Sequence, residues 1–163
     1  MTKCLCGLNI VEFSGNVNAE HLLILDAPDF EDVRNGFMMA GDVAEIMRNE
    51  LRVIGIDLLA TRVVSLWRHA KPKKKSECTV DDHVRGMAGE LKGHRSILVM
   101  GNEASKILFD EAPLMDVCGL LLKSDLIPEE TIITAAPNPF SLLHGMKGEM
   151  DLSLQKYRRY LDE

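Results

Sequence analysis

The sequence predicts an α/β fold, a three-layer α/β/α sandwich with a central four-stranded parallel sheet. Short apolar runs typical of buried strands alternate along the chain with segments that have helical spacing of apolar residues. The apolar runs are nearly continuous, as expected for strands covered on both faces. The chain has 163 residues, the size of one domain with a substantial core, so we expect residues 1–163 to form a single domain.

Four apolar runs are the predicted strands, and each is followed by a turn or a polar segment. The first ends at Pro28, which has no backbone N–H to donate to a sheet, and the second is rich in Val and Leu. The third leads into a Gly-Asn pair, and the fourth leads into a Pro-Asn-Pro sequence. The four runs are residues 22–25, 58–66, 96–100 and 131–136.

Helical segments separate these runs. Residues 42–54 carry apolar side chains along one helical face and stop at Gly55. A second helix is predicted to start at Thr79 as its N-cap, with Asp82 three residues later. Residues 117–127 are apolar but have no decisive period. The other predicted helices are residues 103–109 and 151–161.

The charge of the chain is uneven. The net charge is −6, whereas residues 68–75 carry five positive charges and no negative one, which leaves −11 on the remainder. A protein that binds polyanions over its whole surface is normally basic, so this composition excludes a general polyanion binder. The basic segment, which includes Lys71, Lys73, Lys74 and Lys75, is either a solvated loop or a local contact for phosphates.

The chain has no sequence signal for a membrane or for export. No apolar run reaches the roughly 18 residues that span a bilayer, and the N-terminus has no long apolar stretch of a signal peptide. We therefore expect a soluble, cytoplasmic protein that is monomeric and has no membrane partner.

Four cysteines are the candidate metal ligands. Cys4 and Cys6 have Cys-x-Cys spacing, and Cys78 and Cys118 are isolated in the sequence. A structural zinc site normally uses Cys pairs two to four residues apart together with two further ligands. We expect instead four partly buried thiols, with no metal and no cofactor.

Polar residues follow two of the predicted strands at the edge where parallel sheets bind ligands. Four acids fall within residues 26–32, a density that suits either an oxygen-ligated cation, a water-activating carboxylate or a polar surface loop. Asp26 stands directly at the strand end, whereas we expect Glu31 and Asp32 to be solvated. Asn138 lies between two prolines, either as an ordinary tight turn or as an amide held rigidly against a ligand.

Four segments resemble motifs of the uracil-DNA glycosylase superfamily, most closely its bacterial family-four branch. Residues 27–41 resemble the first motif (Gly-Glu-Ala-Pro-Gly, then Glu-Asp, Gly, Pro-Phe and Gly) without a gap. Residues 61–64 resemble the Thr-Asn-Val-Val of the family, and residues 97–104 its Val-Leu-Gly-x-x-Ala. Residues 138–143 resemble its His-Pro-Ser-x-Leu-Leu. The motifs occur in family order over residues 22–145, and the resemblance implies the same α/β/α fold.

The resemblance implies a DNA glycosylase that flips uracil out of DNA and hydrolyses its N-glycosidic bond. Asp26 would then position or activate water, and Asn138 would stabilise the departing base. Lysines of the basic segment would contact the DNA backbone. The implied base-binding residues are Ala27, Pro28, Asp29, Phe37, Met39 and Arg62, and the implied DNA-binding residues are Lys71, Lys73, Lys74, Lys75, Ser141 and His144.

The sequence differs from the family pattern at four features. Arg62 replaces an Asn that pairs a donor with an acceptor, Met39 replaces a stacking Phe, and Asn138 replaces a His. The iron–sulfur cluster of the family uses four cysteines beginning with Cys-x-x-Cys, so the Cys-x-Cys here predicts no cluster. The alternative function is a non-catalytic protein of the same fold that binds DNA or a replication or repair protein.

Overall fold

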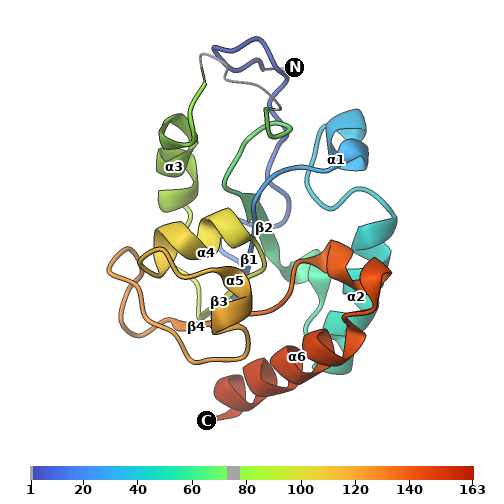
Figure 1. The fold of residues 1–163 in the computed structure, drawn as a ribbon, viewed down its shortest axis with the longest axis vertical. Helices are drawn as coiled ribbons and strands as arrows, with labels where there is room; N and C mark the ends of the chain where they lie inside the picture. The colour runs from blue at the N-terminus through green and yellow to red at the C-terminus, as the bar shows by residue number, and fades with distance from the viewer. Residues whose placement is uncertain (1, 73–77) are drawn as a thin grey trace.

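The computed structural model describes residues 2–72 and 78–163 (Figure 1). Its centre is a parallel sheet with the strand order β2-β1-β3-β4. Leu23 in the central strand β1 pairs with Val63 of β2 on one side and with Leu98 of β3 on the other. The strands are β1 (His21–Leu25), β2 (Arg62–Ser65), β3 (Ser96–Val99) and β4 (Ile132–Ala135).

Helices cover both faces of this sheet, which confirms the predicted three-layer architecture (Figure 1). No helix among the described residues is both long enough and apolar enough to cross a membrane. The helices are α1 (Phe30–Asn35), α2 (Asp42–Val53), α3 (Val80–Ala88), α4 (Asn102–Leu108), α5 (Leu114–Val117) and α6 (Lys147–Asp162), with short 3-10 turns at Leu58–Ala60 and Pro139–His144.

The alternation of side chains along each strand divides the core into two apolar layers. Leu23 and Val63 point to the face that α2 and α6 cover, where they pack with Met47 and Leu154. The neighbouring strand residues point to the opposite face, where Leu22 belongs to the cluster that includes residues of α3, α4 and α5. Successive side chains of a strand point to opposite faces, so apolar residues at every strand position produce a sheet buried on both sides.

The second strand is shorter than the apolar run that predicts it. Residues 58–60 form a 3-10 turn, because the Asp57 carboxylate accepts a hydrogen bond from the backbone N–H of Leu59 at 3.0 Å. The strand begins only at Arg62. The predicted helix start at Thr79 is confirmed, because the Asp82 carboxylate accepts from the Thr79 N–H at 2.7 Å.

The acidic segment after β1 forms a helix rather than an extended surface loop. Asp29 is the N-cap of α1, and the chain leaves this helix at Gly36, where φ is +82°. The expectation that Asp32 is solvated is wrong, because only 3% of this residue is exposed. Its carboxylate accepts from the backbone N–H groups of Asp29 and Ala40, which replace the hydrogen bonds that water would provide.

Each edge of the sheet is partly covered by irregular chain. Ser14 pairs with Val63 of β2 through two backbone hydrogen bonds of 3.0 and 2.8 Å. At the other edge, the apolar stretch of undecided period, residues 117–127, begins at the last residue of the short helix α5 and is otherwise irregular chain. In that chain, Leu122 donates its backbone N–H to Ile133 of β4 at 2.9 Å.

Candidate functional site

Three of the four family-like segments follow strands of the sheet on its carboxyl edge. Asp26 comes directly after β1, Gly101 comes two residues after β3, and Asn138 comes three residues after β4. Parallel strands place their carboxyl ends at one edge, so these segments, which are far apart in the sequence, all lie there. We refer to this region as the carboxyl edge.

Asp26 is held against the start of α4. One carboxylate oxygen accepts from the backbone N–H of Ala104 at 2.9 Å, and the other accepts from that of Glu103 at 3.1 Å. The close approach requires Gly101, because a Cβ atom at that position would lie 2.3 Å from Asp26 Oδ1. The packing of the end of β1 against the start of α4 therefore fixes the orientation of this carboxyl group.

The environment of Asp26 changes its acidity. Burial raises the pKa of the carboxyl group above its ordinary value, and the hydrogen bonds from Ala104 and Glu103 only partly oppose this effect. The side chain is not fully buried. Each carboxylate oxygen has two acceptor positions, so the two backbone bonds leave acceptor capacity for a water molecule.

The residues after Asp26 have different surroundings. Pro28 is buried, and Asp29 accepts from the Asp32 N–H at 2.8 Å, which starts helix α1. Phe37 is 47% exposed, so its ring is available to a ligand at the surface. Met39 has a left-handed backbone with φ of +57° and packs against the apolar layer beneath α2 and α6. Ala27 is half-buried and packs against the opposite apolar layer.

Asn138 begins the 3-10 turn that follows β4. Its side-chain oxygen accepts from the Phe140 N–H at 3.0 Å, and this bond does not use the side-chain NH2 group. The Ser141 hydroxyl is buried and has no hydrogen-bond partner among the described residues, whereas His144 is exposed. This turn therefore offers an amide donor beside an exposed surface.

Arg62 does not lie with these residues. It is the first residue of β2 and pairs with Leu22 near the start of β1. Arg62 therefore lies where the strands begin, at the amino edge of the sheet, whereas Asp26 lies where they end. Its guanidinium donates to both carboxylate oxygens of Glu90, at 2.8 and 3.0 Å, and to the carbonyl of Gly15 at 2.9 Å. The prediction that Arg62 reads a base next to Asp26 is wrong, because the strand begins, rather than ends, at this residue.

We predict that replacing Arg62 with Asn lowers stability rather than tuning a base-binding pocket. The variant R62N leaves the Glu90 carboxylate, whose side chain is only 19% exposed, without its partner. The expected loss is about 1–3 kcal/mol in the free energy of unfolding, measured by urea denaturation. The control K123N breaks a pair whose side chains are 83% and 89% exposed, so it should change stability by less than about 0.5 kcal/mol. Equal effects of the two variants would contradict this prediction.

Trp67 is a residue that sequence analysis overlooked at the carboxyl edge. Its indole N–H donates to the Glu103 carboxylate at 3.3 Å, and Lys71 forms an ion pair with the same carboxylate. These contacts tie the beginning of the basic segment to α4, next to Asp26. The single tryptophan, placed directly after an apolar run, was the available signal. The predicted DNA contacts Lys73, Lys74 and Lys75 lie outside the described residues.

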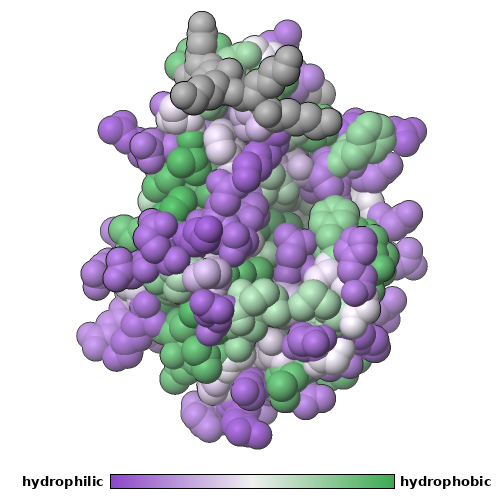
Figure 2. Space-filling model, viewed as in Figure 1, coloured by the Kyte–Doolittle hydropathy of each residue, from purple (hydrophilic) through white to green (hydrophobic). Residues whose placement is uncertain are grey.

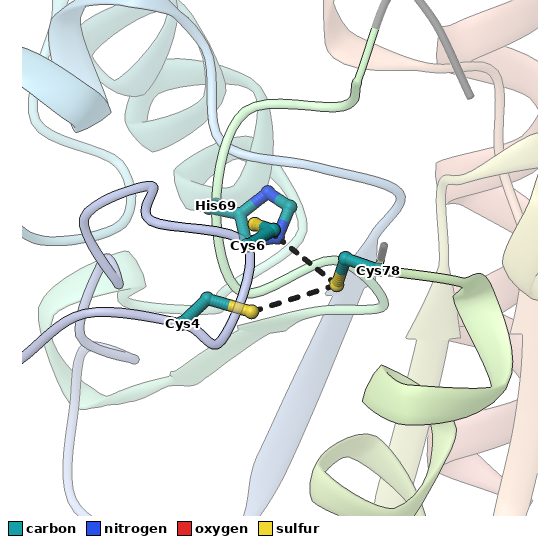
Figure 3. A group of neighbouring side chains, drawn as sticks. All are labelled: Cys4, Cys6, His69 and Cys78. Carbon is teal, nitrogen blue, oxygen red and sulfur yellow. Dashed lines mark hydrogen bonds between the residues drawn. The ribbon is translucent and has the colours of Figure 1, made fainter. Parts of the chain in front are cut away.

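A second group of chemically reactive side chains comprises Cys4, Cys6, His69 and Cys78 (Figure 3). One ligand atom of each residue lies within 4.8 Å of those of the others. Three of the four cysteines that we expected as partly buried thiols lie together, because the N-terminal turn brings Cys4 and Cys6 beside the chain that follows β2. Sequence analysis considered only cysteines as ligands and missed His69, nine residues before Cys78. Cys118 is not part of the group.

An open groove of about 1000 Å³ lies away from the carboxyl edge, between the end of α4, residues 122–131 and the start of β4. Figure 2 shows hydrophobic side chains at the lower left, near the segment that follows α5. The groove contains none of the predicted site residues.

Comparison with known proteins does not assign the chain to a family. No known family model matches the chain, and a search of curated proteins finds no relative of significant similarity. The residues at the carboxyl edge and the resemblance of their motifs are therefore the basis for a functional proposal.

Proposed function

We propose that the protein is a DNA glycosylase that uses the carboxyl edge of its sheet to hydrolyse the N-glycosidic bond of uracil in DNA. The observation that carries this proposal is the convergence of three family-like segments on one sheet edge. Asp26, Gly101 and Asn138 follow three different parallel strands, and they are separated in sequence by more than seventy and more than thirty residues. Ligand sites of parallel α/β sheets lie at this edge.

Asp26 is the residue that we propose to act on water. Its fixed carboxylate has remaining acceptor positions, and its raised pKa makes it a better proton acceptor than an exposed aspartate. In the reaction, the water oxygen bonds to C1′ of the sugar and its proton passes to Asp26. The bond from C1′ to the base breaks, and the base leaves with the bonding electron pair before it takes a proton from solvent.

Asn138 and Phe37 are the residues that we propose to handle the base. The Asn138 NH2 group can donate to an oxygen of the departing anion, since its hydrogen bond to Phe140 uses only the side-chain oxygen. The exposed ring of Phe37 offers a stacking surface, in place of the aromatic residue that Met39 replaces. Both roles require the base to leave the helical stack.

The direct test is incubation of the purified protein with uracil-containing oligonucleotides, single- and double-stranded, followed by alkaline cleavage at abasic sites. The expected result is strand cleavage at the uracil position only. Matched oligonucleotides with thymine in place of uracil provide the control. If uracil, hypoxanthine and mismatched bases all remain attached, catalysis is excluded.

A non-catalytic DNA-binding protein of the same architecture is the second candidate. The observation that favours it is the engagement of Asp26 with α4 and of Arg62 with Glu90, which commits two predicted site residues to structural contacts. This candidate predicts DNA binding without excision in the same oligonucleotide experiment, and it allows a replication or repair protein as a further partner.

Both candidates predict that the basic segment contributes to DNA binding through phosphates. Replacing Lys73, Lys74 and Lys75 with Ala should reduce the slope of log affinity against log salt by about 2–3, since each phosphate contact contributes about 0.7–0.9. Fluorescence anisotropy with labelled oligonucleotides over a salt series measures this slope.

The control for the lysine variant removes the same charge from exposed positions elsewhere, by replacing Lys92, Lys123 and Arg159 with Ala. It should leave the salt slope nearly unchanged. Equal reductions of the salt slope in the two variants would indicate a general effect of net charge. The basic segment would then be interpreted as a solvated loop without phosphate contacts.

A further inference from the structure

We propose that Cys4, Cys6, His69 and Cys78 bind one mononuclear Zn²⁺ ion in a closed Cys3His site. The three contacts that link the group have similar lengths. Cys4 Sγ lies 3.5 Å from Cys78 Sγ, and His69 Nε2 lies 3.4 Å from both Cys6 Sγ and Cys78 Sγ. Figure 3 shows the sulfur atoms and the imidazole ring converging from separate segments on one small volume.

These separations match a tetrahedral ion. With Zn–S bonds of about 2.3 Å and Zn–N bonds of about 2.0–2.1 Å, a tetrahedron places two sulfurs about 3.8 Å apart and a sulfur and a nitrogen about 3.6 Å apart. A [4Fe–4S] cluster instead binds each cysteine through a different iron, which holds the ligand atoms farther apart, and it uses four thiolates. The donor set and its spacing therefore fit one zinc ion and do not fit the cluster of the resembled family.

The histidine is oriented with its ligating nitrogen toward the sulfurs. His69 Nδ1 lies 2.8 Å from the backbone carbonyl of Ala70, which can only accept, so this nitrogen carries the proton. The Nε2 atom of the neutral ring then has its lone pair directed at Cys6 and Cys78. Zinc-bound histidines are commonly fixed by a hydrogen bond of this kind from the other ring nitrogen.

A second histidine contacts Cys78 from outside the group of four. His83 Nδ1 accepts from the backbone N–H of Arg68 at 3.1 Å, so the proton of the neutral ring is on Nε2. That nitrogen lies 2.7 Å from Cys78 Sγ and donates to it. A hydrogen bond from a neighbouring side chain to a ligand atom is the kind of outer contact that orients metal ligands.

The site would join three segments of the chain. Cys4 and Cys6 come from the N-terminal turn, His69 from the chain after β2, and Cys78 from the residue before the Thr79 cap of α3. All four ligands are protein atoms, and His69 and Cys78 are buried, which is typical of a structural zinc site and not of a catalytic one with an open position.

Metal analysis of the full-length protein, purified without chelators, tests the proposal. We expect elemental mass spectrometry to find about one zinc ion per chain. Replacement by Co²⁺ should produce the intense visible bands of a tetrahedral cobalt–thiolate site. Stoichiometric iron with inorganic sulfide would overturn the proposal, as would a protein that contains no zinc and takes up neither Zn²⁺ nor Co²⁺.

Substitutions distinguish the four proposed ligands from Cys118, the cysteine outside the group. C6S and H69Q should each lower zinc retention at least tenfold under competition with a chelator, whereas C118S should retain it as the wild type does. H69C keeps four ligands, so it should retain metal and shift the cobalt bands toward those of a four-thiolate site, even if C6S fails to fold. Full retention in both C6S and H69Q, or cobalt bands in H69C identical to those of wild type, would overturn the assignment. None of these outcomes depends on base excision.

Discussion

Replacing Asp26 with Asn is expected to lower the rate of base excision by about 10²–10³-fold. The amide cannot accept the proton of the attacking water. The Asp26 carboxylate is the one predicted catalytic group that is fixed at the carboxyl edge by two backbone hydrogen bonds. Single-turnover kinetics on a uracil oligonucleotide measure the rate, and anisotropy with the same oligonucleotide should show nearly unchanged affinity.

The same substitution has a structural effect that must be separated from catalysis. Asn can accept from only one of the two N–H groups of α4, and loss of such a cap costs about 0.5–2 kcal/mol. The control D57A removes the carboxylate that caps the 3-10 turn before β2, near the amino edge of the sheet, and loss of such a cap to Ala costs a similar amount of stability. It should leave excision within about threefold of wild type. If D57A and D26N slow excision equally, Asp26 acts only through stability.

The pH dependence provides an independent check of this role. A general base acts in its ionised form, so excision should increase as pH rises through the pKa of Asp26. Burial raises that pKa, so the acid limb of the rate profile should lie at higher pH than for an exposed aspartate. In D26N this limb should disappear from the residual rate. An unchanged limb in D26N would assign it to another group.

Removing zinc is expected to have the largest effect on stability. A metal that binds only the folded chain stabilises it by about 4 kcal/mol when its free concentration is about 1000 times the dissociation constant. For a chain of this length, that loss corresponds to a decrease of about 10 °C in the unfolding midpoint. Differential scanning fluorimetry with and without a strong chelator, followed by addition of Zn²⁺, measures the decrease and its reversal.

This zinc-dependent stability should itself depend on pH. Thiolates and neutral imidazole bind the ion, so protons compete with it, and the stabilisation should be largest at neutral pH and diminish as pH falls. C118S should follow the wild type throughout, since its thiol is outside the group. A midpoint that stays constant when zinc is removed would show that the site makes no contribution to folding.

The sheet could be predicted from the sequence because its signal is local. Each strand is an apolar run bounded by a turn, and both apolar layers follow from the period of two along a strand. The exact end of a strand depends on nonlocal pairing. The apolar run suggested a strand from residue 58, but the Asp57 cap delays it to Arg62, which moves this arginine from the middle of the predicted strand to its amino end.

The site could be predicted only in part, for a related reason. Asp26 and Asn138 follow strands, so the topology alone places them at one edge. The burial of Asp32 depends on the Ala40 N–H, eight residues away, and the contact between Cys6 and His69 crosses 63 positions of the sequence. Such contacts have no periodic signature in one sequence, and the cysteine spacing gave no indication that a histidine completes the group.

The pairing at both sheet edges has a consequence for self-association. An exposed edge strand offers unpaired backbone groups that can recruit a strand from another molecule, which leads to aggregation or to sheet-mediated dimers. Here Ser14 occupies both backbone groups of Val63 on β2, and Gly119 and Leu122 donate to Ala135 and Ile133 on β4. Strand addition would have to displace these segments first, so the covered edges disfavour self-association by extension of the sheet.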